Sequence, residues 1–387
     1  MTFPTSALGG GYGFGVYIHW PYCTRICPYC DFNVYAAKNR DTGPLVEAIC
    51  ADLVRQHESF GASHSLSTIY FGGGTPSLLG EAGLAQILET VHACFGAPRW
   101  ETTLEANPLD VTRESLSSWN RLGITRLSLG VQSLRDEALG FLGRDHTSAQ
   151  ARRAVQDALV MFPSTSMDLI YARPSQSISD WEVELGETLS LGAPHLSLYE
   201  LTIEERTVFG KKAARGELAP MDDDAQADLY ERTQEICEAA GLPAYEISNH
   251  ARSAAFESSH NRIYWQSGDW IGVGPGAHGR LTQAGKRLAT QALRTPAAYI
   301  QAAKSNLPQI EVEALSGTDT LREFVAMGLR PREGIDLQRA SAMGLTFNPT
   351  LLSDLESEGL MTRSADRITL TGNGRLLADH ITARLAP

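Results

Sequence analysis

Short apolar runs alternate with amphipathic stretches along the first half of the chain. The runs are rich in β-branched and aromatic residues, and each amphipathic stretch has helical spacing and ends near Gly or Pro. The pattern predicts six strands, at residues 15–20, 67–73, 102–107, 126–132, 166–172 and 195–203. It predicts helices between them, at 44–60, 81–95, 112–122, 148–161 and 178–191.

This alternation of strand and helix predicts an α/β fold with a parallel sheet. Six units joined by right-handed crossovers favour a partial (βα)6 barrel over a closed barrel of eight. In such sheets the chemistry gathers at the carboxyl ends of the strands. The polar clusters considered below follow predicted strands, so we expect them to meet at one edge of the sheet.

Four segments follow from the pattern. Residues 1–14 are Gly-rich and are predicted to be a flexible N-terminus, and residues 15–230 are predicted to form the barrel. Residues 231–309 are predicted to be an extension packed on the barrel, with the motifs HNRIYW (260–265) and GVGPGAHG (272–279). Residues 310–387 are predicted to form a small, mainly helical domain of winged-helix type.

Charge and hydropathy narrow the classes of partner. The 387 residues carry a net charge of -12, which argues against nucleic acid or an anionic membrane as the main partner. No run of 18 apolar residues occurs, and the first residues lack the basic and apolar parts of a signal peptide. A cytoplasmic protein is therefore expected. The sequence leaves open a membrane-associated acceptor protein and a homodimer.

Three of the six cysteines stand close together in CTRICPYC, at Cys23, Cys27 and Cys30. Thiolates are soft donors that suit iron-sulfur clusters, and a cubane held by three of them leaves one iron open to another ligand. A zinc ion completed by a remote residue, or three structural thiols, are the alternatives. The other cysteines, Cys50, Cys94 and Cys237, are isolated in helix-like segments, which is typical of buried thiols in a reducing compartment.

A glycine motif follows the second predicted strand, in YFGGGTP (70–76). Consecutive glycines allow the backbone to approach a ligand closely and to offer N–H donors. A flexible turn is the simpler interpretation of such a motif taken alone. Its position one βα unit after the cysteine loop, at the same edge of the sheet, favours a binding site.

Together these motifs resemble the radical S-adenosylmethionine (SAM) superfamily. The resemblance covers roughly residues 15–280 and is closest to the oxygen-independent coproporphyrinogen III oxidase group, through VYIHWPYCTRICPYCDFN, GGGTPS, EANP, GVQS, GRDH and DLIYARP. It implies a 4Fe-4S cluster on Cys23, Cys27 and Cys30, with the amino and carboxylate groups of SAM on the fourth iron. By the same resemblance, SAM would be bound by Tyr17, Gly73, Gly74, Thr75, Glu105, Gln132, Arg144 and Asp168.

The residues themselves leave simpler roles open for three of these positions. Glu105 and Asp168 could be helix caps, and Arg144 could be one half of a surface ion pair. The implied roles are chemically sound, because carboxylates accept hydrogen bonds from ammonium and hydroxyl groups and an arginine fork pairs with a carboxylate.

Two departures separate the chain from the oxidases of this group. Phe32 stands where they carry a further cysteine, and the segment before Cys23 is shorter than theirs. The chain instead resembles the haem-chaperone branch of the group, which implies haem as a third bound cofactor and haem-accepting proteins as partners. A radical SAM coproporphyrinogen III dehydrogenase is the alternative function, and whether the chain is an enzyme is left open. A zinc-containing structural protein is a third class.

The haem ligand is the least determined part of the site. His260 in HNRIYW precedes two aromatic residues and is predicted, through the family resemblance, to ligate the haem iron near the barrel mouth. Taken alone, a buried structural histidine is the more ordinary interpretation. The competing candidates are His19, His146, His250 and His278, of which His278 in GVGPGAHG is the strongest.

Overall fold

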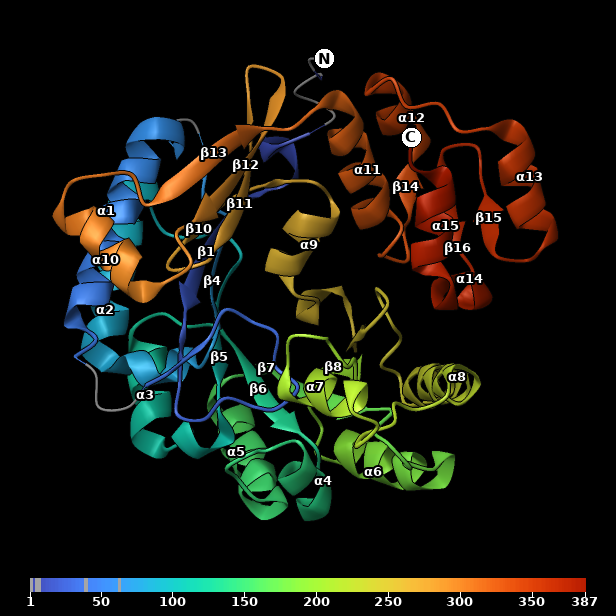
Figure 1. Cartoon of the computed structure of the whole chain (residues 1–387), viewed down its shortest axis with the longest axis horizontal. Helices are drawn as coiled ribbons and strands as arrows, with labels where there is room; N and C mark the ends of the chain where they lie inside the picture. The colour runs from blue at the N-terminus through green and yellow to red at the C-terminus, as the bar shows by residue number, and fades with distance from the viewer. Residues whose placement is uncertain (1–2, 4–7, 38–40, 62–63) are drawn as a thin grey trace.

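The computed structural model, which describes residues 3, 8–37, 41–61 and 64–387, is built around one large mixed sheet (Figure 1). Its eleven strands run in the order β13-β12-β11-β10-β1-β4-β5-β6-β7-β8-β9. The six predicted strands form its parallel centre, as β1 (Phe14–Trp20), β4 (Thr68–Gly73), β5 (Glu101–Ala106), β6 (Arg126–Gln132), β7 (Ser164–Tyr171) and β8 (His195–Glu200). The prediction of a partial (βα)6 barrel is confirmed.

The helices between these strands cover the outer face of the sheet. They are α1 (Gly43–Gln56), α2 (Gly80–Phe95), α3 (Arg113–Arg121), α4 (Asp136–Phe141), α5 (Ser148–Met161) and α6 (Ile178–Ser190). Local sequence fixes where several of them begin, because Thr112 and Thr147 each form a capping box with the residue three positions later. The apolar sides of the helices and the outward residues of the strands form the main hydrophobic core. Of these helices, the sequence pattern missed only the short α4.

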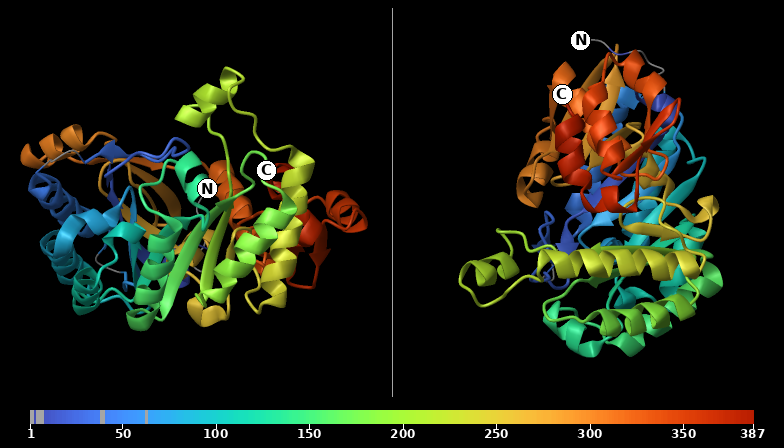
Figure 2. Two further views of the ribbon diagram at one scale, coloured as in Figure 1. Left: turned by 90° about the horizontal axis from the view of Figure 1, so that it is seen from below. Right: turned by 90° about the vertical axis from the view of Figure 1, so that its right-hand side faces the viewer.

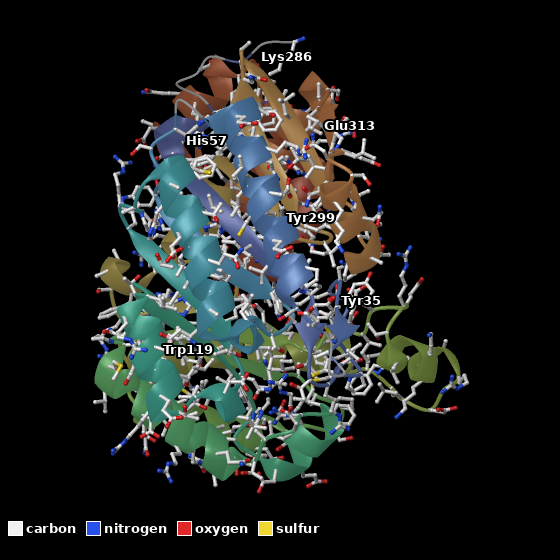
Figure 3. All side chains as sticks on the ribbon, turned by 90° about the vertical axis from the view of Figure 1, so that its left-hand side faces the viewer. Tyr35, His57, Trp119, Lys286, Tyr299 and Glu313 are labelled. Carbon is white, nitrogen blue, oxygen red and sulfur yellow. The ribbon has the colours of Figure 1, made fainter. Side chains whose placement is uncertain are left out.

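The predicted extension, residues 231–309, continues the same sheet. It contains β9 (Asn249–Ala251), α9 (Ser259–Trp265), β10 (Asp269–Val273), β11 (His278–Gln283), β12 (Lys286–Ala292) and α10 (Pro296–Lys304). β10 lies parallel to β1, and β11, β12 and β13 (Ile310–Ala314) follow it antiparallel. Helix α10 packs beside α1, where the Tyr299 hydroxyl donates to Asp52 over 2.6 Å (Figure 3). The boundary predicted at residue 310 is therefore too early, since β13 belongs to the large sheet.

Residues after β13 form a small domain with its own core. It comprises α11 (Gly317–Gly328), β14 (Ile335–Asp336), α12 (Leu337–Ala342), α13 (Pro349–Ser357), β15 (Met361–Arg363), β16 (Arg367–Leu370), α14 (Gly372–Leu376) and α15 (Ala378–Leu385). A three-stranded sheet in the order β14-β16-β15 completes the winged-helix-like arrangement that the sequence predicts.

Two residues near the N-terminus pack on this small domain. Phe3 and Leu8 are buried in its hydrophobic core, and the Phe3 amide donates to the Gly285 carbonyl over 2.7 Å. The prediction of a flexible segment at residues 1–14 is wrong for these two residues, because their apolar side chains find a core that the Gly-rich composition does not reveal. Residues 1–2 and 4–7 lie outside the described part of the chain.

One segment projects from the body of the molecule. It follows β8, carries the short helix α7 (Val208–Ala214) and returns into α8 (Asp223–Ala239) (Figure 2). The projecting segment also touches the cysteine loop, because the Phe209 amide donates to the Pro28 carbonyl over 2.9 Å. Across the described residues, no helix is both long and apolar enough to cross a membrane.

Candidate functional site

The cysteine loop leaves the carboxyl end of β1 and is closed by a small sheet of its own. Strand β2 (Tyr22–Cys23) pairs in parallel with β3 (Tyr35–Ala36), and the Ala37 amide donates to the Cys23 carbonyl over 2.9 Å. Figure 3 shows Tyr35 on this short strand, near the end of β1. The loop between the two strands is thereby held as a unit that contains all three clustered cysteines.

One cavity of about 470 Å³ lies at the carboxyl ends of β1 and β4–β8. All three cysteines of the loop line it, together with seven of the eight residues predicted to bind SAM, namely Gly73, Gly74, Thr75, Glu105, Gln132, Arg144 and Asp168. The expectation that the polar clusters meet at one edge is therefore met. The eighth, Tyr17, is not among the lining residues, and its hydroxyl forms a 2.9 Å hydrogen bond with His19 Nδ1.

The glycines at residues 73 and 74 serve close packing between strands. A Cβ at Gly73, where φ is +109°, would lie 2.5 Å from the His19 ring, and one at Gly74 would lie 2.8 Å from the Tyr22 carbonyl oxygen. The amide of Gly74 donates to Trp20, and that of Thr75 donates to Tyr22. These two amides are not free to donate to a ligand, because they hold β4 against the end of β1 and the cysteine loop. The binding of SAM by these residues stays a prediction.

Two carboxyl groups form the polar floor of the cavity. Glu105 accepts hydrogen bonds from the Tyr70 hydroxyl at 2.8 Å and from the Gly73 amide at 3.1 Å, and burial raises its pKa to about 7. Asp168 accepts from the Ser128 and Ser166 hydroxyls, and burial also raises its pKa. Neither carboxylate caps a helix. Both accept hydrogen bonds from strand residues, which orients them toward a ligand with ammonium or hydroxyl groups.

Arg144 stands between the cavity and the cysteine loop. Its guanidinium donates to Cys27 Sγ over 3.4 Å and to the Gly130 carbonyl over 3.1 Å, while its Nε is buried without a partner. It is not a surface ion pair. Gln132 lies near Arg144, since both side chains approach Gly130, and it stands at a β-bulge between β6 and β7 with a positive φ of 65°.

The donor set fits an iron-sulfur cluster better than a single metal ion. Among the described residues, no three His, Cys, Asp or Glu side chains are grouped so that they could hold one ion. A cubane would take one thiolate on each of three irons, which suits three thiols that line one cavity. Burial raises the pKa of Cys23, and that of Cys30 to about 11, so binding of iron would release their protons.

His260 lies away from this cavity, at the amino ends of the strands. Its ring is fully buried, with Nδ1 2.7 Å from Thr68 Oγ1 and Nε2 2.6 Å from the Tyr264 hydroxyl, and its amide donates to Glu101. Helix α9 thus lies at the amino ends of β1 and β4, between the sheet and α11 (Figure 1). The predicted position near the mouth is wrong, and both ring nitrogens are hydrogen-bonded within the protein, whereas the role of His260 as haem ligand stays a prediction.

The competing histidines differ in their exposure. His19, His146 and His250 are buried and hydrogen-bonded within the protein. His278 is exposed at the start of β11, at the same end of the sheet as the cavity.

Several residues of the cavity were missed by the sequence analysis. Ser128, Tyr199, Glu200 and Asn107 all contribute to its lining. The first two alternate with buried leucines in RLSL and HLSLYE, so strand periodicity places them on the inner face. That alternation is the sequence signal that could have identified Ser128 and Tyr199. Asn107 has no such signal, because the turn after β5 sets its position.

The fold and the site define the class of protein. Residues 17–185 match the radical SAM superfamily, and residues 315–377 match the HemN C-terminal domain. The chain is a radical SAM protein, and membership of that superfamily implies a 4Fe-4S cluster and SAM.

Full-length relatives narrow the class to a family. The chain is 37% identical over 392 residues to the protein named heme chaperone HemW of Mycobacterium tuberculosis. The aligned region covers 100% of this chain and 98% of the relative. It is 35% identical over 374 residues to the protein named heme chaperone HemW of Escherichia coli. That aligned region covers 95% of this chain and 96% of the relative. The chain belongs to the HemW family.

A solved structure shares the whole fold. Coproporphyrinogen III oxidase (HemN) from Escherichia coli, described as a radical SAM enzyme, has a TM-score of 0.80 over 100% of this chain and 96% of that chain. At 20% identity this likeness concerns the fold alone.

Proposed function

We propose that this chain is a haem chaperone that holds a 4Fe-4S cluster, SAM and haem and transfers haem to an acceptor protein. The observation that carries the proposal is its identity of 37% to a heme chaperone HemW over the full length of both chains. The acceptor is a haem-binding protein that the sequence does not name.

The residues of the cavity have distinct roles in this proposal. Cys23, Cys27 and Cys30 would hold a 4Fe-4S cluster, which would supply an iron able to bind SAM. Arg144, with its buried and unpartnered Nε, pairs with the SAM carboxylate.

The floor of the cavity binds the rest of SAM. Glu105 accepts from the SAM ammonium, and Asp168 accepts from the ribose hydroxyls, because each carboxylate is already held in place by neighbouring hydroxyl groups. Gln132 on its bulge and the lining residues Gly73, Gly74 and Thr75 shape the walls. Tyr17, whose hydroxyl is hydrogen-bonded to His19, contacts SAM from beside Glu105.

The alternative enzyme reaction is disfavoured by one residue at the mouth. Phe32 follows the third cysteine at the position where the resemblance places a further cysteine in the oxidases, and its side chain is 63% exposed. A phenyl ring offers no donor to a metal or a radical intermediate. We therefore expect no conversion of coproporphyrinogen III.

Two assays on anaerobically reconstituted protein test the proposal. Haem titration followed by mixing with an apo-haemoprotein should show binding and then transfer. Incubation with coproporphyrinogen III, SAM and a reductant should yield no protoporphyrinogen IX. Absence of haem binding would remove the chaperone function, and product formation that depends on Cys23 would establish the dehydrogenase instead.

A further inference from the structure

A line of hydrogen-bonded groups leads from the floor of the cavity to the start of helix α9. Asp168 and Ser166 share one face of β7, and Ser166 Oγ lies 3.2 Å from Asp168 Oδ1. Ser166 pairs in register with His195 on β8, whose Nδ1 lies 2.7 Å from the same hydroxyl. On the far side of the ring, His195 Nε2 lies 2.9 Å from the Tyr245 hydroxyl, to which the Ser258 amide donates over 3.1 Å. Residues far apart in the sequence thus form one continuous line of polar atoms.

The inner members of this line are closed to solvent. Ser166, His195 and Tyr245 are each at most 2% exposed, so their polar groups depend on one another and not on bulk water. Burial, with the charges of Arg126 and His250, lowers the pKa of His195 well below its usual range, and the ring is therefore neutral. A neutral imidazole has one donor and one acceptor nitrogen, so the hydrogen bonds can run in only two directions.

The two ends of the line decide its direction. The Ser258 amide can only donate, so the Tyr245 oxygen accepts from it and the Tyr245 proton is left for His195 Nε2. His195 then carries its own proton on Nδ1 and donates it to Ser166, whose proton is left for the Asp168 carboxylate. In the reverse direction Ser166 would donate to His195 and no longer to Asp168. The Tyr245 hydroxyl would then be a buried donor without an acceptor, which costs free energy.

This direction matters for the charge on Asp168. Burial raises the pKa of Asp168. Hydrogen bonds from the hydroxyls of Ser197, Ser128 and Ser166 lower it, and so favour the carboxylate, the form that accepts from a ligand. A longer contact of 3.3 Å joins Ser166 Oγ to Ser197 Oγ, so a Ser166 hydroxyl that is not held by His195 is free to turn away from Asp168. His195 therefore determines which acceptor the Ser166 hydroxyl serves.

The outer end of the line is fixed by the small domain. The Arg332 amide, between α11 and β14, donates to the Tyr245 carbonyl over 3.0 Å. The Arg332 guanidinium pairs over 3.3 Å with Glu257, the residue before Ser258. The small domain thereby holds both groups at which the line begins, the Ser258 amide and the Tyr245 hydroxyl.

We propose that His195 is a positioning residue of the SAM site, which turns the Ser166 hydroxyl toward Asp168 and so holds this carboxylate as an acceptor for the ribose hydroxyls of SAM. The proposal rests on the role given to Asp168 above and adds the residues that set its state. His195 is not among the residues that line the cavity, so it acts through Ser166 and not by contact with the ligand. The line also gives the small domain a physical route to the ribose end of SAM.

Two ligands separate this positioning role from general stability, namely SAM and an analogue with a dideoxyribose in place of the ribose. Isothermal titration of the reconstituted parent should show that SAM binds about tenfold or more tightly than the analogue, which offers Asp168 no hydroxyl. Ser166→Ala removes the donor to Asp168, and Tyr245→Phe removes the proton that keeps His195 Nε2 an acceptor. Both should reduce the ratio of affinities to about threefold or less. A change that only loosens the fold should weaken both ligands alike and leave the ratio unchanged.

Two substitutions of His195 test the position of the group that holds Ser166. The amide of Asn is as many bonds from the backbone as Nδ1 of histidine, whereas the amide of Gln is as many bonds away as Nε2. His195→Asn should therefore keep the ratio of the parent, and His195→Gln should lose it.

His250→Asn is the matched control, because His250 is a buried histidine on the adjoining strand β9 and lies outside the line. It should bind both ligands as the parent does, and iron and sulfide content should show that each sample carries its cluster. A ratio as large as that of the parent in both Ser166→Ala and His195→Gln would overturn the proposal and leave the ribose contact of Asp168 standing. A parent that binds SAM and the analogue equally would overturn the ribose contact and the proposal together.

Discussion

The guanidinium of Arg144 donates a hydrogen bond to Cys27 Sγ over 3.4 Å and thereby joins the end of β6 to the cysteine loop. Its second terminal nitrogen is held by the Gly130 carbonyl, and its Nε has no partner in the protein. A buried donor without an acceptor costs free energy unless a ligand supplies one. The SAM carboxylate is the acceptor that this arrangement fits, since a fork of N–H groups pairs with two carboxylate oxygens.

Replacement of Arg144 by Met should weaken SAM binding by about tenfold or more, since a hydrogen bond to a charged group contributes about 1.5–3 kcal/mol. The SAM affinity of Arg144→Lys should lie between those of the parent and Arg144→Met, because lysine keeps the positive charge but lacks the forked guanidinium. Isothermal titration of reconstituted protein with SAM measures the effect. Arg153→Met, at a position 84% exposed on α5, is the matched control and should bind SAM as the parent does. Equal affinity in Arg144→Met would exclude the proposed contact.

The cluster should depend on the loop cysteines alone. Cys27→Ala leaves two of the three thiols, so iron and sulfide content after anaerobic reconstitution should fall to background. Cys94→Ala, a half-buried thiol near the end of α2, should retain the parent content. Iron and sulfide in Cys27→Ala equal to the parent values would show that this thiol is not a ligand.

Glu105 should make the cluster-free protein less stable as pH rises. Its pKa is about 7 in the folded chain, against about 4.3 in an unfolded one. Between these values the folded state holds a proton that the unfolded state has lost, so the stability that Glu105 contributes falls as pH rises through this window. The melting temperature of the parent should therefore drop more between about pH 5 and about pH 8 than that of Glu105→Gln.

The comparison isolates one carboxyl group from the others. Asp52 is also buried, with a pKa raised to about 6, and it contributes in the same direction in both proteins. The difference between the two pH dependences therefore belongs to Glu105. Parallel curves for the parent and Glu105→Gln would mean that its pKa is not raised in the folded protein.

The barrel could be predicted because its signals are local and strong. Short strands that are buried along most of their length alternate with helices that have a clear apolar side, and each predicted strand is found within three residues of its expected bounds. The cavity residues followed from the same regularity, since the carboxyl ends of parallel strands share an edge. Cys27 and Arg144 meet there although 117 positions separate them in the chain.

What could not be predicted depends on contacts between distant segments. The sequence HNRIYW does not reveal at which end of the barrel its helix packs, and that end is set by the path of the chain after β9. The backbone amides of Gly74 and Thr75, after β4, donate hydrogen bonds to residues that follow or end β1. A glycine-rich motif in the sequence does not reveal such contacts. Likewise Leu8, in a Gly-rich segment, is buried by a domain more than 300 residues later.

That N-terminal contact should contribute measurably to stability. Leu8 is 2% exposed within the core of the small domain, so Leu8→Ala should lower the free energy of unfolding by about 2–5 kcal/mol. Leu307→Ala, at a position 57% exposed, should change it by less than about 0.5 kcal/mol. Thermal unfolding of both variants provides the comparison. Equal melting temperatures would show that the segment does not pack on this core in solution.

His260 should prove to be a structural residue. Its replacement by Ala leaves the Thr68 and Tyr264 hydroxyls without their partner and opens a cavity behind Tyr70, whose ring stacks on it at 5.0 Å. Each unsatisfied buried group costs about 1–3 kcal/mol, so the melting temperature should fall clearly. Tyr264→Phe, which removes one of the two hydrogen bonds, should have a smaller effect.

The folded fraction of His260→Ala should bind haem with the Soret spectrum of the parent, because the histidine lies at the amino ends of the strands and both of its nitrogens are engaged. The variant should therefore lose stability and keep the haem spectrum. A shifted Soret band in His260→Ala with an unchanged melting temperature would restore His260 as the ligand, and would require helix α9 to move away from the amino ends of the strands when haem binds.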